Sequence, residues 1–131
     1  MGDRANIAIK QYNSEERVWL YGHWIGARTI EVARTVIDRR VQLADSSYLA
    51  RVIFEAMIPE DQHGDSMGYG ISTQITDNEY PIIVFDPNTQ TIQIEESDGT
   101  PLTPAVSYVT FADRAVTGDF DKTIKRMWLN K

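Results

Sequence analysis

The hydrophobic residues of this chain change their spacing along the sequence, and this change limits the folds that the chain can adopt. Residues 6–12 and 17–24 alternate with a period of two, as strands do, and the short polar segment between them predicts a β-hairpin. From residue 28 the spacing becomes helical, with one apolar stripe through residues 28–41. A second helix is expected between the start signal at Asp45 and the stop before Pro59.

Strand-like runs return in the second half of the chain. Four strands are expected there, over residues 71–75, 81–85, 91–95 and 106–111. The last strand has an alternative, because Thr110 could instead cap a short helix. A helical stripe from Asp119 to Trp128 predicts a final helix. The order ββ-αα-ββββ-α indicates one domain, residues 1–131, with an α+β fold. Its sheet is expected to be largely antiparallel, with the helices packed on one face and the other face left for a partner.

The composition excludes several classes of protein. The chain has no Cys, which excludes disulfide scaffolds, thiol nucleophiles and cysteine-based zinc sites. No apolar run of about 18 residues occurs and the first residues form no apolar signal core, so we expect no membrane contact and a cytoplasmic protein. Phosphate-binding glycine motifs and catalytic motifs are missing from the sequence, and we expect no cofactor and no catalytic residue. His63 and Asp65 are too small a donor set to predict a metal site.

The net charge of −6 is distributed unevenly along the chain. Residues 1–58 have a net charge of +1 and residues 59–131 one of −7, and eleven acidic residues but no basic one lie between Arg51 and Arg114. Duplex nucleic acid requires a basic face that displaces counterions, so we expect no duplex binding. Nine of the 13 basic residues are Arg, whose planar donors suit phosphate, carboxylate or base edges. Surface ion pairs are the alternative interpretation of these arginines.

Aromatic residues are concentrated in the second predicted strand. Trp19, Tyr21 and His23 fall on one side of it, and Trp24 follows directly. One interpretation is a half-buried histidine within an aromatic cluster. The other is a surface on which a flat ligand stacks, since stacking is worth about 1–3 kcal/mol per base and tolerates any base. The sequence leaves both interpretations open.

Polar residues elsewhere could complete such a binding surface. Arg4 and Asn6 enter the neighbouring strand, and Arg28 opens the first helix, where a cation and free backbone donors suit an anion. The turn at residues 77–80 is rich in hydrogen-bonding groups and could read a base edge or a ribose if it folds over the hairpin. The candidate ligand-binding residues are Arg4, Asn6, Trp19, Tyr21, His23, Trp24, Arg28, Asp77, Asn78 and Tyr80.

Four segments of the chain resemble a family of small phage and prophage proteins of unassigned function. These segments are Gly2–Asn6, Tyr21–Gly26, Leu49–Phe54 and Gly70–Pro81. The resemblance covers most of residues 2–86, and its most specific parts are the opening Gly-Asp-Arg-Ala-Asn and the run Thr-Asp-Asn-Glu-Tyr-Pro. It implies a viral or prophage origin and action in the cytoplasm of the host bacterium. Small acidic phage proteins without cysteine are often inhibitors or sponges that sequester nucleotide signals, and this association is by analogy.

Three functions follow as hypotheses. The first is a non-catalytic anti-defence sponge that sequesters a small phosphorylated nucleotide, an immune signal, at the hairpin aromatics. The second is an acidic inhibitor that binds a basic cleft on a host defence enzyme. The third is a small phosphodiesterase-like enzyme that uses His23 as a general acid or base. A sheet face lined by Trp, Tyr and Ile exceeds what a monomer usually exposes, so we also expect a homo-oligomer.

Overall fold

The structure is a computed structural model that describes residues 3–40, 43–60, 68–113 and 117–129. The strands are β1 (Ala5–Lys10), β2 (Arg17–Gly22), β3 (Tyr69–Ser72), β4 (Ile82–Asp86), β5 (Thr91–Glu95) and β6 (Val106–Ser107). The helices are η1 (Gly26–Arg28), α1 (Thr29–Arg39), α2 (Ser46–Met57), α3 (Tyr108–Ala112) and α4 (Gly118–Ile124), which continues as η3 (Lys125–Leu129). The predicted α+β class is confirmed.

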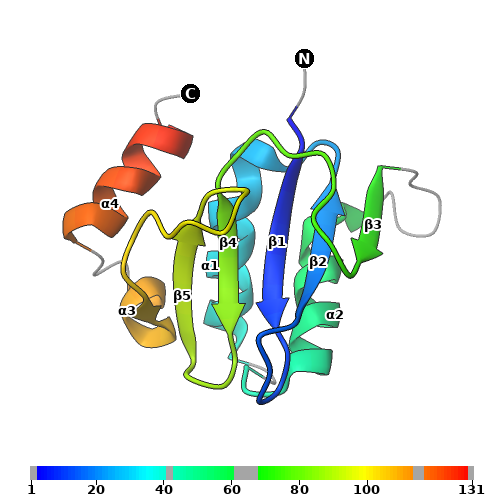
Figure 1. Cartoon of the computed structure of the whole chain (residues 1–131), viewed down its shortest axis with the longest axis horizontal. Coiled ribbons are helices and arrows are strands. Elements are labelled where there is room, and N and C mark those ends of the chain that lie inside the picture. Colours follow the sequence, from blue (N-terminus) through cyan, green and yellow to red (C-terminus); the bar gives the residue numbers. More distant parts are fainter. Residues whose placement is uncertain (1–2, 41–42, 61–67, 114–116, 130–131) are drawn as a thin grey trace.

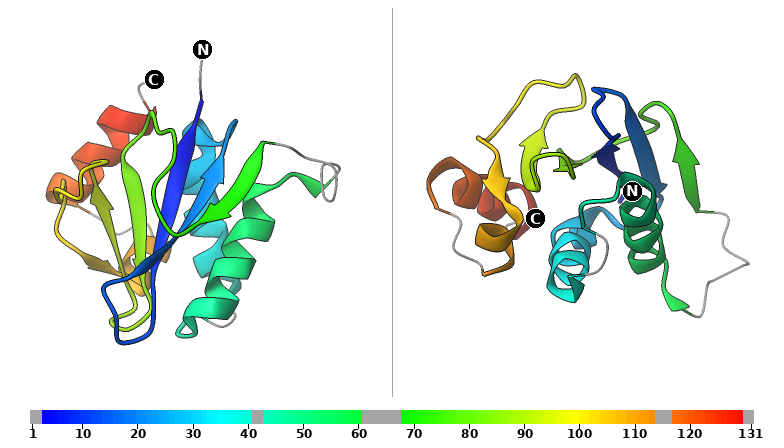
Figure 2. Two further views of the ribbon diagram at one scale, coloured as in Figure 1. Left: turned by 45° about the vertical axis from the view of Figure 1, so that its right-hand side comes forward. Right: turned by 90° about the horizontal axis from the view of Figure 1, so that it is seen from below.

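One six-stranded sheet carries the fold, in the order β3-β2-β1-β4-β5-β6. The pair β1–β4 is parallel, and the remaining neighbours pair antiparallel. The helices lie on one face of this sheet, with α1 and α2 side by side behind β4, β1 and β2 and α4 beside β5 (Figures 1 and 2). A largely antiparallel sheet with helices on one face is therefore what the chain forms. Among the described residues, no helix combines the length and apolar composition needed to cross a membrane.

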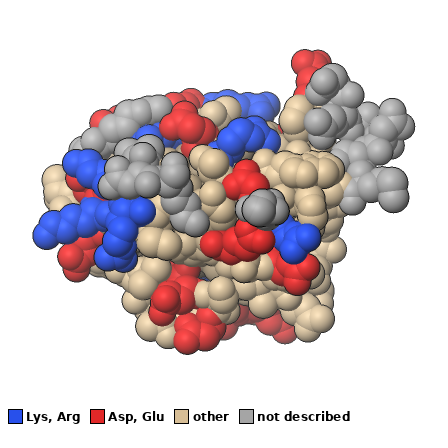
Figure 3. All heavy atoms as spheres, turned by 90° about the horizontal axis from the view of Figure 1, so that it is seen from above, with Lys and Arg blue, Asp and Glu red and all other residues tan. Residues whose placement is uncertain are grey.

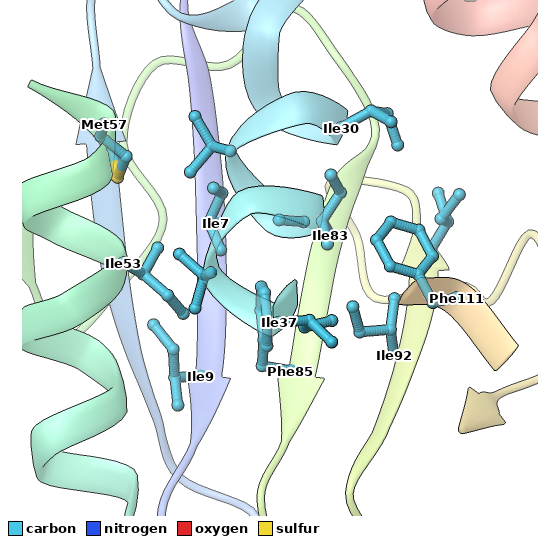
Figure 4. Packing of buried hydrophobic residues seen from close by; sticks show 14 of the residues in the cluster. Ile7, Ile9, Ile30, Ile37, Ile53, Met57, Ile83, Phe85, Ile92 and Phe111 are labelled. Carbon is cyan, nitrogen blue, oxygen red and sulfur yellow. The ribbon is translucent and has the colours of Figure 1, made fainter. Parts of the chain in front are cut away.

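The main core fills the space between the sheet and the helices. Because side chains alternate along a strand, Ile7 and Ile9 of β1 face the helices together with Ile83 and Phe85 of β4. Their counterparts on the helices include Ile37, and Figure 4 shows how these groups interdigitate. The buried residues labelled there are Ile7, Ile9, Ile30, Ile37, Ile53, Met57, Ile83, Phe85, Ile92 and Phe111.

Local signals set the limits of α2. The Asp45 carboxylate accepts hydrogen bonds from the Ser47 hydroxyl and from the backbone N–H groups of Tyr48 and Ser47, and these hydrogen bonds, that of the hydroxyl first, lower the pKa of Asp45 below its usual range. At the other end, Ile58 is extended because Pro59 follows it. Both ends of this helix agree with the prediction.

The last predicted strand differs from the structure. Residues 106–111 were expected to be extended, but the strand has two residues and the helix α3 follows at once. The cap is Ser107, whose Oγ accepts from the Thr110 backbone N–H, so Thr110 is not itself the capping residue. Helical spacing lets Tyr108 and Phe111 both reach the core. The element order is therefore ββ-αα-ββββ-αα, with one short helix more than predicted.

The face of the sheet opposite the helices is covered by the chain itself. The segment 73–81, which connects β3 to β4, crosses in front of β2 and β1 (Figure 1). Ala8, Ile82 and Val84 lie at the centre of this face and are buried. Arg17 and Glu95 form a bidentate ion pair on it, with N–O distances of 2.8 and 3.1 Å. The prediction that this face is left for a partner is wrong for its centre, and homo-oligomer formation stays a prediction.

Candidate functional site

The candidate site lies where β1 begins and β2 ends. Arg4 precedes β1, and His23 and Trp24 follow β2, whose last residue is Gly22. Backbone hydrogen bonds join these segments to the connections around them. The His23 N–H donates to the Gly68 carbonyl at 2.7 Å, and the Glu79 N–H donates to the Arg4 carbonyl at 3.0 Å. Residues that are far apart in the sequence therefore meet at one end of the sheet.

Four side chains form a polar cluster there, which we call the Arg4 cluster: Arg4, Tyr21, His23 and Asp77. Arg4 Nε donates to His23 Nδ1 at 3.3 Å, and Arg4 Nη1 lies 3.8 Å from Asp77 Oδ2. The Tyr21 hydroxyl lies 3.1 Å from the same His23 Nδ1. Since Arg4 can only donate, His23 Nδ1 is the acceptor, and the neutral imidazole carries its proton on Nε2. The cluster therefore offers the Nε2–H and the guanidinium as donors and the Asp77 carboxylate as an acceptor.

Trp24 stands beside this cluster with 54% of its surface exposed. Its ring meets the His23 ring edge to face at 4.9 Å and the Tyr69 ring at 6.1 Å. Gly68 lies directly against the indole, and a Cβ at that position would come within 2.4 Å of a ring carbon. The indole therefore packs against three neighbours, although much of its surface faces solvent.

A hollow of about 380 Å³ is lined by the cluster and Trp24 together. Its lining residues are Arg4, Tyr21, His23, Trp24, Gly68 and Asp77. A second hollow of about 470 Å³ adjoins it, since Tyr21 and Asp77 line both. These volumes fall within the range of about 300–1,000 Å³ that small-molecule sites usually have.

Asn6 fastens the segment that carries Asp77. Its side chain is fully buried, and its Nδ2 donates to the carbonyls of Thr76 at 3.3 Å and Asp77 at 3.1 Å and to Asn78 Oδ1 at 3.2 Å. The Asn6 Oδ1 accepts from the Thr76 N–H and hydroxyl. With both ends of its amide engaged, Asn6 positions the segment 76–78 and lies out of reach of a ligand in the hollow.

Two predicted site residues, Arg28 and Tyr80, do not line the hollow. Arg28 donates from Nη2 to the Met57 carbonyl at 2.9 Å, at the C-terminal end of α2. Tyr80 is buried, and its ring stacks on the Trp128 ring with centroids 6.3 Å apart. Burial, assisted by a hydrogen bond to Asp3 and by the charge of that carboxylate, raises the pKa of Tyr80 to about 12. Arg28 and Tyr80 therefore have structural partners of their own.

Trp19 and Asn78 are also engaged within the chain. Trp19 packs against the small cluster around Ala8, and the Arg17 guanidinium lies 5.8 Å from the centre of its ring. Asn78 accepts from Asn6 and donates to Ser97 Oγ at 3.1 Å. Of the ten residues predicted for the site, the structure brings Arg4, Tyr21, His23, Trp24 and Asp77 together.

Sequence reasoning missed two groups that shape the site. Gly68 and Tyr69 flank the indole of Trp24. Gly68 matters because it has no side chain that would collide with the ring. The strand β3 begins at Tyr69, two residues before the predicted strand 71–75, and the place of Gly68 beside Trp24 depends on a contact with a residue 44 positions earlier. The sequence contains no local signal for that contact.

Comparisons with known proteins add no assignment. No protein-family model, no curated protein and no solved structure matches the chain. The resemblance to small phage proteins therefore stays a prediction. The described residues contain no group of three or more metal-binding side chains, and the pair His63 and Asp65 lies outside them.

Proposed function

We propose that the protein is a non-catalytic binding module for a small nucleotide-type ligand, held in the hollow between Trp24 and the Arg4 cluster. One observation carries this proposal: a large indole packs against His23, Gly68 and Tyr69 yet is 54% exposed, next to a guanidinium and a carboxylate that line the same hollow. An exposed indole that packs against neighbours offers a stacking surface at little entropic cost.

Each part of a nucleotide has a partner in this arrangement. The base stacks on the Trp24 ring, the phosphate accepts from the Arg4 guanidinium and from His23 Nε2–H, and the Asp77 carboxylate accepts from a base edge or a ribose hydroxyl. The combination of one aromatic surface with donors and an acceptor on the same hollow suits a ligand that is flat at one end and anionic at the other.

Binding is favoured over catalysis by the state of His23. A general base needs a free lone pair within reach of the proton that it removes. In His23 the Nδ1 lone pair faces Arg4 and the Tyr21 hydroxyl, and Nε2 carries the proton. The imidazole therefore has no lone pair to offer the hollow, which counts against His23 as the general base of a phosphodiesterase.

The biological role in this proposal is sequestration. We infer, from the resemblance to phage proteins, that the ligand is an immune signal of an infected bacterium and that the protein lowers its free concentration. The alternative of an acidic inhibitor depends on the acidic residues after Pro59. Glu95, one of them, is buried in the ion pair with Arg17 and is not presented to a partner.

Isothermal titration calorimetry with a panel of mononucleotides and cyclic nucleotides tests the proposal. We expect wild-type protein to bind at least one member and Trp24→Ala to lower its affinity by about tenfold or more, because stacking on one aromatic ring contributes about 1–3 kcal/mol. Tyr48→Ala is the matched control, since Tyr48 is also an exposed aromatic residue, on α2. No heat with any member at protein concentrations of tens of micromolar would overturn the proposal, and so would equal affinity of Trp24→Ala and wild type.

A further inference from the structure

We infer that the hollow selects a nucleotide with a single negative charge, a phosphodiester such as a cyclic nucleotide, and disfavours nucleoside monophosphates and triphosphates. This inference rests on the proposed function and adds the chemical class of the ligand. It follows from the balance of charge around Arg4.

Within the described part of the chain, Arg4 is the one Lys or Arg that lines the hollow, and it is already paired. Its Nη1 lies 3.8 Å from Asp77 Oδ2, and the two side chains are 38% and 77% exposed. Because Asp77 also lines the hollow, the guanidinium and the carboxylate together present no net charge to a ligand. A phosphate that approaches Arg4 therefore also approaches a carboxylate.

Two further acidic residues lie next to this pair along the backbone. Glu79 is exposed, and its backbone N–H binds the Arg4 carbonyl. Asp3 precedes Arg4 and accepts from the Ala27 N–H. Arg28, the basic residue that sequence reasoning placed here, donates instead to the Met57 carbonyl.

The charge of the wider surface and of the sequence agrees with the balance of charge around Arg4 and Asp77. Figure 3 shows the end of the molecule at which β1 begins. Basic side chains gather at the left of this view, on the side where α4 lies. Toward the middle of the view, acidic side chains lie between the basic ones. The sequence from Arg51 to Arg114 contains no basic residue between these two. The long stretch that includes Gly68 and Asp77 therefore supplies no second cation for a polyphosphate.

Coulomb's law gives the size of the expected selectivity. Once the guanidinium balances the first charge of the ligand, one additional charge at roughly 6 Å from the Asp77 carboxylate, at an effective dielectric constant of about 40, meets a repulsion of about 1.4 kcal/mol, which is about a tenfold loss of affinity. A phosphodiester carries one negative charge, which a shared guanidinium can balance. A monophosphate and a triphosphate carry more, and each additional charge faces Asp77 without a new cation.

The test compares probes that share a base and differ in charge. Calorimetry in buffer with a chelator would measure 3′,5′-cyclic AMP, 5′-AMP, ATP and adenosine, and the corresponding guanine compounds. We expect the cyclic nucleotide to bind most tightly in a series that binds, 5′-AMP or 5′-GMP about tenfold more weakly, and the triphosphate more weakly still. A triphosphate or monophosphate that binds as tightly as the cyclic nucleotide would overturn the inference while leaving the proposed function intact, and so would a nucleoside that binds more tightly. Binding of no probe would overturn the proposed function and this inference with it.

Two variants separate charge from shape. Asp77→Asn keeps the size of the side chain and removes its charge, so we expect the tenfold difference between 5′-AMP and cyclic AMP to shrink to about threefold or less. Asp113→Asn removes an exposed charge at the end of α3 and should leave the difference unchanged. An unchanged difference in Asp77→Asn would show that ring closure of the phosphate, and not charge, sets the preference, and would overturn the inference.

Discussion

The two faces of the sheet are held by different forces. On the helix side, apolar residues such as Ile7 and Phe85 bury their surface against α1 and α2, and any group of suitable size and hydrophobicity stabilises that packing. On the opposite face, Asn6 and Glu95 are buried polar groups, and each depends on a specific partner, which for Glu95 is the half-buried Arg17. The candidate site belongs to this second face. The comparison shows that the core depends on apolar packing without specific partners, whereas the face that holds the candidate site depends on specific polar contacts.

The largest loss of stability is expected when a large side chain is removed from the core between the sheet and the helices. Phe85→Ala removes a fully buried ring and should lower the free energy of unfolding by about 3–5 kcal/mol, from lost burial and the cavity that remains. Urea denaturation followed by circular dichroism measures the change. Tyr12→Ala, an exposed aromatic residue in the β1–β2 connection, is the control and should change little. A loss below about 1 kcal/mol for Phe85→Ala would contradict the assignment of the core.

The ion pair tests the opposite face. Glu95→Ala leaves the half-buried Arg17 guanidinium without its bidentate partner and should cost about 2–3 kcal/mol. The double variant Arg17→Ala/Glu95→Ala should cost less than the sum of the two single changes, because the unpaired charge is then removed. A double-mutant cycle from urea denaturation measures this coupling. Additive effects would show that the pair contributes no interaction energy.

Asn6 sharpens the comparison, because its loss should affect one face and spare the other. Asn6→Ala leaves the polar groups of Thr76 and Asp77 without their buried partner and should cost about 1–3 kcal/mol. Hydrogen–deuterium exchange should then accelerate in residues 73–80, while the protection of β1 and β4 amides relative to global unfolding stays as in wild type. Uniform acceleration through the whole sheet would contradict a local role for this amide.

The smallest expected effect concerns alkaline pH. The unfolded chain ionises Tyr80 near pH 10, whereas burial raises the pKa of Tyr80 in the folded protein to about 12. Between these values the unfolded state binds fewer protons, so the free energy of unfolding falls as the pH rises from 10 to 12. Tyr80→Phe should reduce this fall, which denaturation at pH 9 and at pH 11 measures. An equal fall in both proteins would show that Tyr80 does not cause it.

The fold was predictable where its signals are local. Asp45 and Pro59 mark the two ends of α2, and each acts on residues within three positions of itself. The prediction of a strand over residues 106–111 failed because the spacing of its apolar residues fits both a strand and a helical turn. Only the cap at Ser107 distinguishes the two. Even there, the alternative of a short helix followed from the sequence.

The site was predictable only in part, for the same reason. His23 and Trp24 are neighbours in sequence, so their aromatic cluster follows from position alone. Whether Arg4 and Asp77 reach them depends on how the connection from β3 to β4 crosses the sheet, and Asn6 fixes that path from about 70 positions away. Arg28, which was predicted for this surface, donates instead to the Met57 carbonyl, because a helix start gives a position in the chain and not a direction in space.

The fastening of the segment 76–78 by Asn6 has a thermodynamic consequence for recognition. A connection of this kind, left unattached, would lose its backbone freedom only when a guest arrived, and each residue so ordered would weaken association by roughly 1–2 kcal/mol. Here the buried amide restrains the connection in the folded chain before any guest is present. The receptor is thus preorganised on its acidic side, and association through Asp77 should resemble the docking of two rigid bodies.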